Sequence, residues 1–150
     1  MSCLVAFKPA DVTNYYGEVF QKGTRNDFAI RFDSTTGKLQ YLFGLSSAFV
    51  AYSTSEALTN NQWYIAQISV DAATNLVVRF YLNGVLREER AVSSGTLTNT
   101  SSELRLGNQS EFGGIEVFNG SVAIAHMYDR FLTESEIQQN YNALKGRFGL

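Results

Sequence analysis

The 150-residue sequence has few of the residues that build catalytic and metal centres. It contains one cysteine, Cys3, and one histidine, His126. A single cysteine excludes a disulfide within the chain. Without a second histidine, a nucleophile–base pair or a cysteine cluster, a catalytic triad or zinc site lacks its parts. We therefore expect His126 to be a packed histidine with a hydrogen-bonded ring, and Cys3 to be a small core residue.

The sequence also lacks an excess of charge and a long apolar run. Twelve Lys and Arg residues against 14 Asp and Glu residues leave a formal net charge of −2. This balance gives no electrostatic case for nucleic acid or an anionic membrane. No window approaches the roughly 20 apolar residues that a membrane-spanning helix needs. Residues 1–10 have neither the basic start nor the apolar length of a signal peptide. We expect no nucleic-acid partner and no membrane insertion.

The residues that are present predict one globular domain rich in strands. Hydrophobic residues make up 45% and charged residues 17% of the chain, as in ordinary globular proteins, and aromatic residues, at 13%, favour strands. The length suits one domain. There is no Gly/Ser linker, charge run or repeat to mark a second domain, so residues 1–150 are expected to form a single domain.

Apolar alternation and turn residues predict the strands. Residues 27–33 and 38–43 alternate cleanly and form one hairpin. The Asn83-Gly84 dipeptide predicts a second hairpin between residues 76–82 and 85–92, because both of its turn positions need positive φ. Trp63 is expected in the core, near the start of a long strand, and residues 54–61 are expected to be irregular. The other predicted strands are residues 2–8, 18–22, 48–52, 62–71, 103–106 and 121–128.

The end of the chain predicts a buried strand followed by one helix. Residues 121–128 are apolar on both alternating faces, which is typical of a central strand buried on both sides. Thr133 and Glu136 have the spacing of a capping box, and Leu132 can close a hydrophobic staple with Ile137. Gly146 is expected to supply the left-handed stop of a helix over about residues 133–145. The apolar face of this helix is expected to carry Ile137, Tyr141 and Leu144.

About ten strands, short turns and one helix predict an all-β sandwich. The stretch FNGSVAIAHMYDRFLTESEIQQNYNALKGRFGL, residues 118–150, resembles the C-terminal signature of laminin-G-like domains in the concanavalin A-like lectin/glucanase superfamily. The resemblance covers roughly residues 3–147, with further landmarks at residues 7–9, 19–23, 63, 80–84 and 104–108. It implies a concanavalin A-like jelly-roll sandwich of two antiparallel sheets with one short C-terminal helix.

Two details of the resemblance bear on the setting. The ending KGRFGL is similar to versions carried by tailed-phage structural proteins. Family domains usually open with an extra strand that lies beside the final strand, and the segment matching residues 4–9 comes after it. Here that first strand is missing, and an unpaired edge would invite a partner strand. Either the chain is a piece of a longer protein, or a neighbouring subunit covers the edge, or the strand is dispensable.

Three classes of function follow from the resemblance. The first is a non-catalytic phage virion protein, a capsid decoration, fibre or tail component, whose lectin-like domain can bind cell-surface glycan and whose partners are other copies or other virion proteins. The second is a carbohydrate-binding or adhesion module of a larger secreted protein, which would place it outside the cell. The third is a glycoside-acting enzyme. Its two carboxylates would sit in an E-x-D-x-x-E pattern, which the sequence does not contain, so we expect no enzyme.

Carbohydrate binding needs aromatic faces for the apolar side of a sugar and amides or carboxylates for its hydroxyl groups. The loops hold such residues, although tyrosines can also simply cap the rim of a small core. Phe49, Asn14 and Gln109 are secondary candidates. The leading candidates are Tyr15, Tyr16, Tyr52, Asn108 and Phe112.

Calcium is the one cofactor that the resemblance suggests, because many relatives hold Ca²⁺ at a loop rim beside the ligand site. Calcium takes several oxygen ligands from carboxylates, amides and carbonyl groups. The sequence has no spaced calcium motif, and loop acids are usually just solvated. The candidate ligands are Asp71, Asn108, Glu111 and Glu116.

Overall fold

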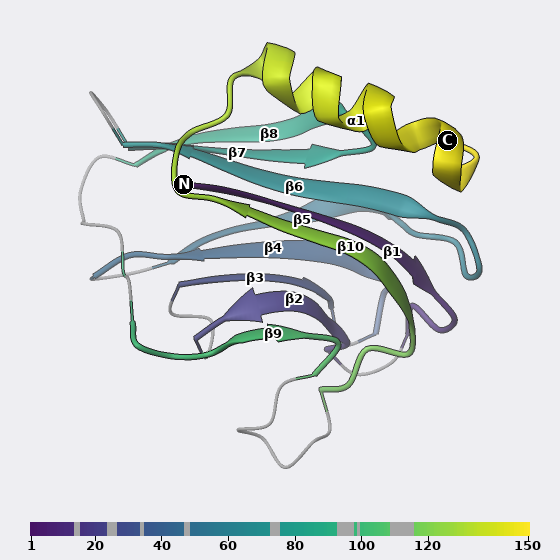
Figure 1. The fold of residues 1–150 in the computed structure, drawn as a ribbon. Helices are drawn as coiled ribbons and strands as arrows, with labels where there is room; N and C mark the ends of the chain where they lie inside the picture. The colour runs from purple at the N-terminus through teal and green to yellow at the C-terminus, as the bar shows by residue number, and fades with distance from the viewer. Residues whose placement is uncertain are drawn as a thin grey trace. The chain divides into compact units, whose positions relative to one another are not determined.

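The computed structural model describes residues 1–13, 16–23, 27–33, 35–46, 49–72, 76–92, 98, 100–108 and 116–150. This part of the chain contains ten strands and one helix. The strands form two antiparallel five-stranded sheets, in the orders β10-β1-β6-β7-β8 and β5-β4-β3-β2-β9 (Figure 1). The predicted all-β class with a single C-terminal helix is therefore confirmed. Within the described residues, no helix has the length and apolar character needed to cross a membrane.

The first sheet is built around two strands that are buried on both faces. It contains β10 (Gly120–Tyr128), β1 (Ser2–Pro9), β6 (Tyr64–Asp71), β7 (Leu76–Leu82) and β8 (Val85–Val92). The central pair, β1 and β6, runs in register from Ser2↔Ser69 to Phe7↔Tyr64. Cys3 lies in β1 and is buried, as expected, and burial raises the pKa of its thiol to about 12. The predicted turn between β7 and β8 is also confirmed, with φ of 52° at Asn83 and 73° at Gly84.

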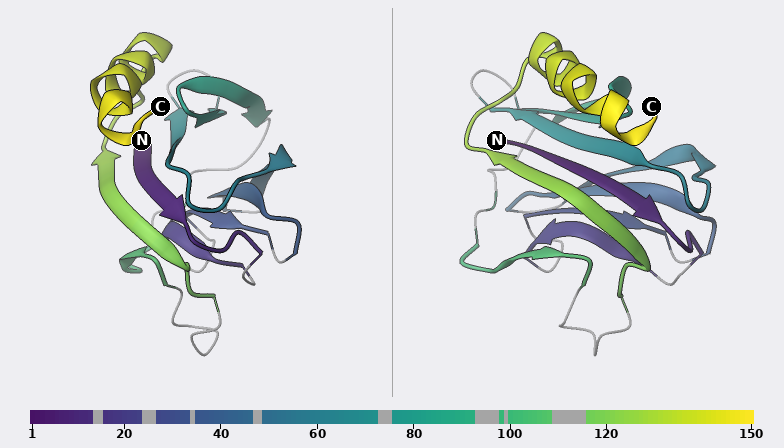
Figure 2. Two further views of the ribbon diagram at one scale, coloured as in Figure 1. Left: turned by 90° about the vertical axis from the view of Figure 1, so that its right-hand side faces the viewer. Right: turned by 45° about the vertical axis from the view of Figure 1, so that its right-hand side comes forward.

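Helix α1 (Glu134–Phe148) lies alongside this first sheet (Figures 1 and 2). The capping box is present: the Glu136 N–H donates to Thr133 Oγ1 at 3.3 Å, and the Thr133 N–H donates to Glu136 Oε2 at 2.9 Å. Leu132 and Ile137 pack together against Tyr81, which confirms the staple. The predicted apolar face is confirmed as well. Beyond Ile137 its side chains cover a cluster of Leu4, Ala6 and Ile65; they are Tyr141, Leu144 and Phe148.

The predicted end of the helix is wrong. Gly146 is an ordinary helical residue, and α1 continues to Phe148. Gly149, three residues later, adopts the left-handed conformation with φ of 70°, and its N–H donates to the Lys145 carbonyl. Either glycine could adopt the left-handed conformation that ends a helix. Packing of the Phe148 ring favours the later glycine, because it keeps residues 147 and 148 helical. The Phe148 ring packs 4.7 Å from the ring of Trp63, which holds the last turn on the sheet. Trp63 itself is half-buried and precedes β6, so its predicted core position is wrong.

The prediction that the final strand is central and buried on both sides is also wrong. Among the described residues, β10 is an edge strand with β1 on one side only, and all nine of its residues are exposed or half-buried. The strand that shares its apolar character and does lie in the centre is β1. His126 is consequently exposed rather than packed in the core, and its Nδ1 lies 3.4 Å from the Tyr128 hydroxyl. The apolar composition of β10 led to the wrong prediction, because composition does not distinguish an uncharged edge strand from a core strand.

The second sheet contains β5 (Phe49–Ala57), β4 (Lys38–Gly44), β3 (Phe28–Phe32), β2 (Glu18–Lys22) and β9 (Leu104–Leu106). Its aromatic face is the core face, where Phe28 pairs with Phe43 and Ile30 with Tyr41. β5 extends beyond the predicted residue 52 and ends at Ala57. The expectation that residues 54–61 are irregular is therefore wrong for residues 54–57. The Thr54 hydroxyl accepts from the Leu39 N–H at 3.1 Å, where the β4–β5 register shifts. This side-chain bond keeps the strands joined through the irregularity.

Candidate functional site

One face of the second sheet is polar, and strand alternation alone places its residues there. Arg31 faces Gln40 across β3 and β4, Gln40 faces Ser53 across β4 and β5, and Gln21 faces Arg105 across β2 and β9. All five side chains lie opposite the aromatic core face, because successive residues of a strand point to opposite sides. We call this surface the polar face.

A chain of polar contacts runs across the polar face from β2 to β5. Arg31 Nη1 lies 3.6 Å from Glu18 Oε1, and Arg31 Nε donates to Gln40 Oε1 at 2.8 Å. Gln40 Nε2 then donates to Ser53 Oγ at 3.4 Å. Glu18 is fully buried and Arg31 is 6% exposed, whereas Ser53 is exposed. The contacts hold the buried charged pair in place and present an amide and a hydroxyl group to solvent at β5.

Phe49 adds an exposed aromatic ring to the polar face. It lies on β5 two and four residues from Ala51 and Ser53, which places all three on the same side of the strand. The side chain is 63% exposed, the highest value among the large hydrophobic residues that the structure describes. An aromatic ring in solvent, with a hydroxyl group and an amide on the same strand face roughly 13 Å further along the strand, offers the contacts that neighbouring units of an oligosaccharide require.

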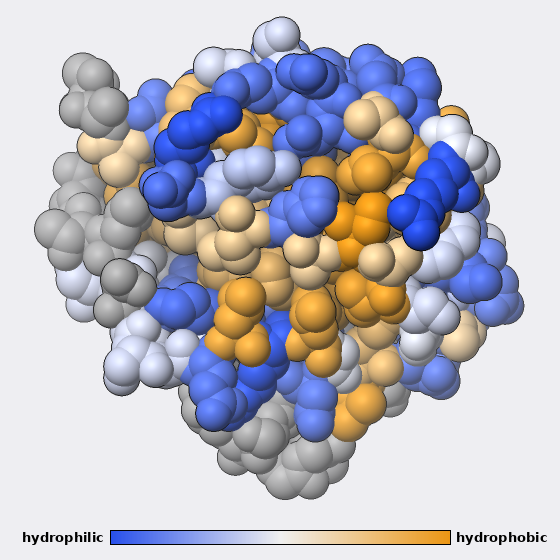
Figure 3. All heavy atoms as spheres, in the orientation of Figure 1, coloured by the Kyte–Doolittle hydropathy of each residue, from blue (hydrophilic) through white to orange (hydrophobic). Residues whose placement is uncertain are grey.

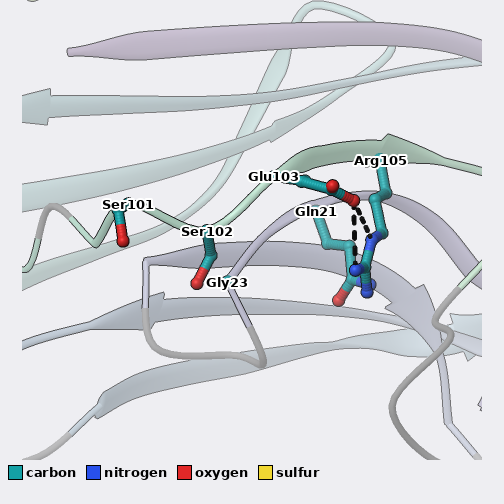
Figure 4. A pocket seen from close by; sticks show the side chains of 6 residues that line it. All are labelled: Gln21, Gly23, Ser101, Ser102, Glu103 and Arg105. Atoms are coloured by element: carbon teal, nitrogen blue, oxygen red, sulfur yellow. Dashed lines mark hydrogen bonds and ion pairs between the residues drawn. The ribbon is translucent and has the colours of Figure 1, made fainter.

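A hollow of about 250 Å³ lies at the other edge of the polar face, between β2 and β9 (Figure 4). Arg105 donates to Glu103 Oε2 through Nε at 3.3 Å and Nη2 at 3.2 Å. Gln21 is only 3% exposed; its Nε2 donates to the Asn108 carbonyl at 3.3 Å, while its Oε1 has no hydrogen-bond partner among the described residues. The described residues that line it are Gln21, Gly23, Ser101, Ser102, Glu103 and Arg105. Two hydroxyl groups, a carboxylate, an amide and a guanidinium suit a small ligand rich in hydroxyl groups.

The Asp27 carboxylate fixes the wall of this hollow. It accepts from the Thr100 N–H at 2.9 Å, from the Thr100 hydroxyl at 2.7 Å and from Lys22 Nζ at 2.9 Å. Burial by itself would raise the pKa of Asp27, but these hydrogen bonds and the Lys22 charge hold it below its usual value. Asp27 therefore remains ionised and ties the segment before β9 to the start of β3.

Of the five leading candidates for carbohydrate binding, two adjoin the polar face, one points away from it, and two lie outside the described residues. The ring of Tyr16 lies 4.3 Å from the Arg31 guanidinium, and the backbone of Asn108 contacts Gln21, so both adjoin the polar face. Tyr52 points to the opposite side of β5, with its ring 6.1 Å from Tyr41. Tyr15 and Phe112 lie outside the described residues, as do Asn14 and Gln109.

The predicted calcium ligands do not form one cluster within the described residues. Asp71 ends β6 in the first sheet and lines a separate hollow with Arg79 and Glu89. Asn108 is exposed beside β9, Glu116 is buried, and Glu111 lies outside the described residues. In the part of the chain that the structure describes, no three His, Cys, Asp or Glu side chains are grouped as a metal would need. Calcium binding stays a prediction.

Sequence reasoning missed the hollow altogether. Gln21 and Arg105 face each other only because β2 pairs with β9, more than 80 positions further along the chain. No local pattern announces such a pairing. β9 has three residues and follows a Ser/Thr-rich segment, so the sequence pattern did not predict which strand it pairs with. By contrast, the alternation of residues 49–53 could have placed Phe49 on the same strand face as Ser53.

Comparisons with known proteins agree with this architecture. The family model described as the concanavalin A-like lectin/glucanases superfamily matches residues 3–138. Among solved structures, the CBM40 of the Ruminococcus gnavus IT-sialidase bound to alpha2,3 sialyllactose is similar, with a TM-score of 0.75, 14% identity, and coverage of 93% of this chain and 81% of that chain.

A second similar structure is domain 4 of AbnA, a GH43 extracellular arabinanase from Geobacillus stearothermophilus, in complex with arabinotriose. Its TM-score is 0.67 at 22% identity, with coverage of 92% of this chain and 64% of that chain. A search of curated proteins finds no sequence match. At these identities, the structural likenesses establish the fold alone.

Proposed function

Because the chain belongs to the concanavalin A-like lectin/glucanase superfamily, we propose that it is a non-catalytic carbohydrate-binding domain that uses its polar face. The observation that carries the proposal is the exposed ring of Phe49 on the same strand face as Ser53. An apolar ring exposed to this extent is stabilised when the apolar face of a sugar covers it. Ser53 and Gln40 then bind the hydroxyl groups of a neighbouring sugar unit further along the strand.

The hollow between β2 and β9 serves as a second contact point for the glycan. The Glu103 carboxylate accepts hydrogen bonds from sugar hydroxyl groups, and the Arg105 guanidinium donates to a hydroxyl or ring oxygen. The structures similar to this chain include two carbohydrate-binding domains with bound oligosaccharide, which supports the same class of ligand here. We infer no catalysis, since the sequence lacks the E-x-D-x-x-E carboxylate pattern.

An extracellular setting fits this proposal, because one of the similar domains belongs to an extracellular arabinanase.

The assignment to a phage virion, with other virion proteins as partners, stays a separate prediction that rests on the resemblance of the last six residues. Mass spectrometry of purified particles from a source organism tests it directly. Presence of the chain in stoichiometric amounts supports a virion component, and consistent absence contradicts one.

The first experiment is a glycan array that includes sialyllactose and arabinotriose, run in calcium and again with a chelator. Binding of a glycan in either condition supports the proposal. Loss of binding in chelator would support calcium as a cofactor. Phe49→Ala should then lower the affinity for the best-bound glycan at least tenfold, as measured by titration calorimetry. Covering about half of an aromatic side chain stabilises the complex by roughly 2 kcal/mol.

The matched control is Val85→Ala, which truncates another exposed hydrophobic side chain on the first sheet and should leave binding unchanged. Arg105→Ala tests the hollow separately. If neither Phe49→Ala nor Arg105→Ala alters the affinity for a bound glycan, the polar face is not the site. If a folded protein binds no glycan on the array, the proposed function is contradicted for all the glycans presented.

A further inference from the structure

Tyr16, beside the polar face, has a strained backbone. Its φ is 42°, in the left-handed region where a bulky L-residue is an outlier. Among the described residues other than glycine, only Asn61 and Asn83 share a positive φ, and asparagine tolerates that conformation far better than tyrosine does. Strained residues persist only where their surroundings hold them, and they cluster at binding sites. The conformation of Tyr16 therefore asks for a functional reason.

The ring of Tyr16 rests on the guanidinium group of Arg31. The central carbon of that group lies 4.3 Å from the centre of the ring. The edges of the guanidinium are fixed in turn, because Nε donates to Gln40 Oε1 at 2.8 Å and Nη1 lies 3.6 Å from Glu18 Oε1. Arg31 and Glu18 are both buried, so the support beneath the ring is rigid. Tyr16 itself is half-buried, which leaves part of its surface open to a ligand.

Exposed apolar surface is not by itself the mark of a ligand site in this protein. Figure 3 shows apolar side chains gathered over β10, where Met127 is 41% exposed. None of the non-glycine residues of β10 has a positive φ. Tyr16 differs because a strained backbone and a buried ion pair both act to hold its ring in one position. Holding a contact group in place before the ligand arrives lowers the entropy cost of binding.

We propose that Tyr16 contacts the glycan directly as a stacking platform and that Arg31 is the positioning residue that holds its ring; this inference rests on the proposed carbohydrate-binding function. Arg31 pairs with Gln40 and Gln40 with Ser53, so two strand spacings separate Arg31 from β5. Phe49 lies four residues from Ser53 along β5, which sets the backbones of Arg31 and Phe49 roughly 16 Å apart. A single sugar unit does not span that distance. The ligand is therefore an oligosaccharide whose different units stack on Tyr16 and on Phe49.

The test uses the glycan that binds best on the array, together with fragments of it that hold one or two sugar units. Tyr16→Ala should lower the affinity for the whole glycan about tenfold or more in titration calorimetry, whereas Tyr16→Phe keeps the ring and should bind nearly as the native chain does. A short fragment cannot reach both rings, so Tyr16→Ala or Phe49→Ala should weaken it, but not both. The matched control is Tyr52→Ala, which removes a tyrosine that points to the opposite side of the same sheet and should leave the affinity unchanged.

The role of Arg31 is tested by coupling it to Tyr16. Arg31→Lys keeps a positive charge for Glu18 but removes the planar group on which the ring rests. It should lower the affinity in the native chain and cause no further loss in the Tyr16→Ala background. A loss of the same size in both backgrounds would show that Arg31 does not act through Tyr16, and would overturn its assignment as a positioning residue.

The backbone strain is tested without any ligand. Tyr16→Gly and Tyr16→Ala both remove the ring, but only glycine adopts a positive φ freely. The Tm of Tyr16→Gly should therefore exceed that of Tyr16→Ala by about 2–4 °C, and equal Tm values would contradict the strain. An array on which the folded protein binds no glycan contradicts the proposed function, and this inference with it. A bound glycan whose affinity Tyr16→Ala leaves unchanged, or alters no more than Tyr52→Ala does, overturns this inference alone.

Discussion

The contact between the β7–β8 turn and α1 offers a sharp test of how the helix is held on the sheet. Gly84 has φ of 73°, and a Cβ atom placed on it would lie 2.6 Å from Tyr141 Cδ1 and 2.8 Å from Tyr141 Cγ. Gly84→Ala therefore imposes two costs. The left-handed backbone conformation costs an L-residue about 1–2 kcal/mol. Displacing a packed ring costs a further 1–3 kcal/mol or so.

Gly107 separates these two costs. Its φ is 75°, nearly the same as that of Gly84, but a Cβ atom there would meet nothing within 4 Å. We expect Gly107→Ala to lower the free energy of unfolding by about 1–2 kcal/mol, from backbone conformation alone. Gly84→Ala should lower it by about 2–5 kcal/mol. For a chain of this size each kcal/mol corresponds to about 2–4 °C in Tm.

The measurement is urea unfolding of both variants, followed by circular dichroism, with the same experiment in a Tyr141→Ala background. Removing the ring removes the two nearest atoms and leaves Tyr141 Cβ, 3.2 Å from the added atom. The cost of Gly84→Ala should therefore fall to nearly that of Gly107→Ala, which is the coupling that a double-mutant cycle detects. Equal costs for Gly84→Ala and Gly107→Ala in the native background would refute the reasoning, because Tyr141 would then not be seated on the turn.

Two further predictions concern the start of α1. Thr133→Ala should lower the free energy of unfolding by about 1 kcal/mol through loss of the N-cap, while Thr133→Ser should retain most of it; an unchanged midpoint in Thr133→Ala would contradict the cap. Hydrogen bonds from Arg130 and from the Thr133 backbone lower the pKa of Glu136 to about 2, from an ordinary 4.5. Because the folded pKa is depressed, the stabilisation from Glu136 is present above pH 4.5 and lost as the pH falls towards 2. The difference in unfolding free energy between the native chain and Glu136→Gln should shrink over that range and with added salt, and a difference independent of pH would rule out the ionised pair.

The local elements of this fold could be predicted from the sequence because their causes are local. The Asn83-Gly84 turn needs positive φ at two adjacent positions, and the capping box and staple need only residues 132–137. Alternation of apolar residues placed most strands within one or two positions, although β5 runs five residues past its prediction. The signature at the end of the chain also indicated the family, which the match over residues 3–138 shows.

The tertiary structure alone decided which strands lie at the edges of the sheets and which residues meet at the site. β1 and β10 are both predominantly apolar, yet one is central and the other is an edge, because strand order depends on pairings between distant segments. The hollow has the same origin: Gln21 meets Arg105 through a pairing that no neighbouring residue specifies. A sequence records the period and the turns of each strand locally. The neighbours of a strand are set by the burial of the whole chain, and both the polar face and the edge position of β10 depend on those neighbours.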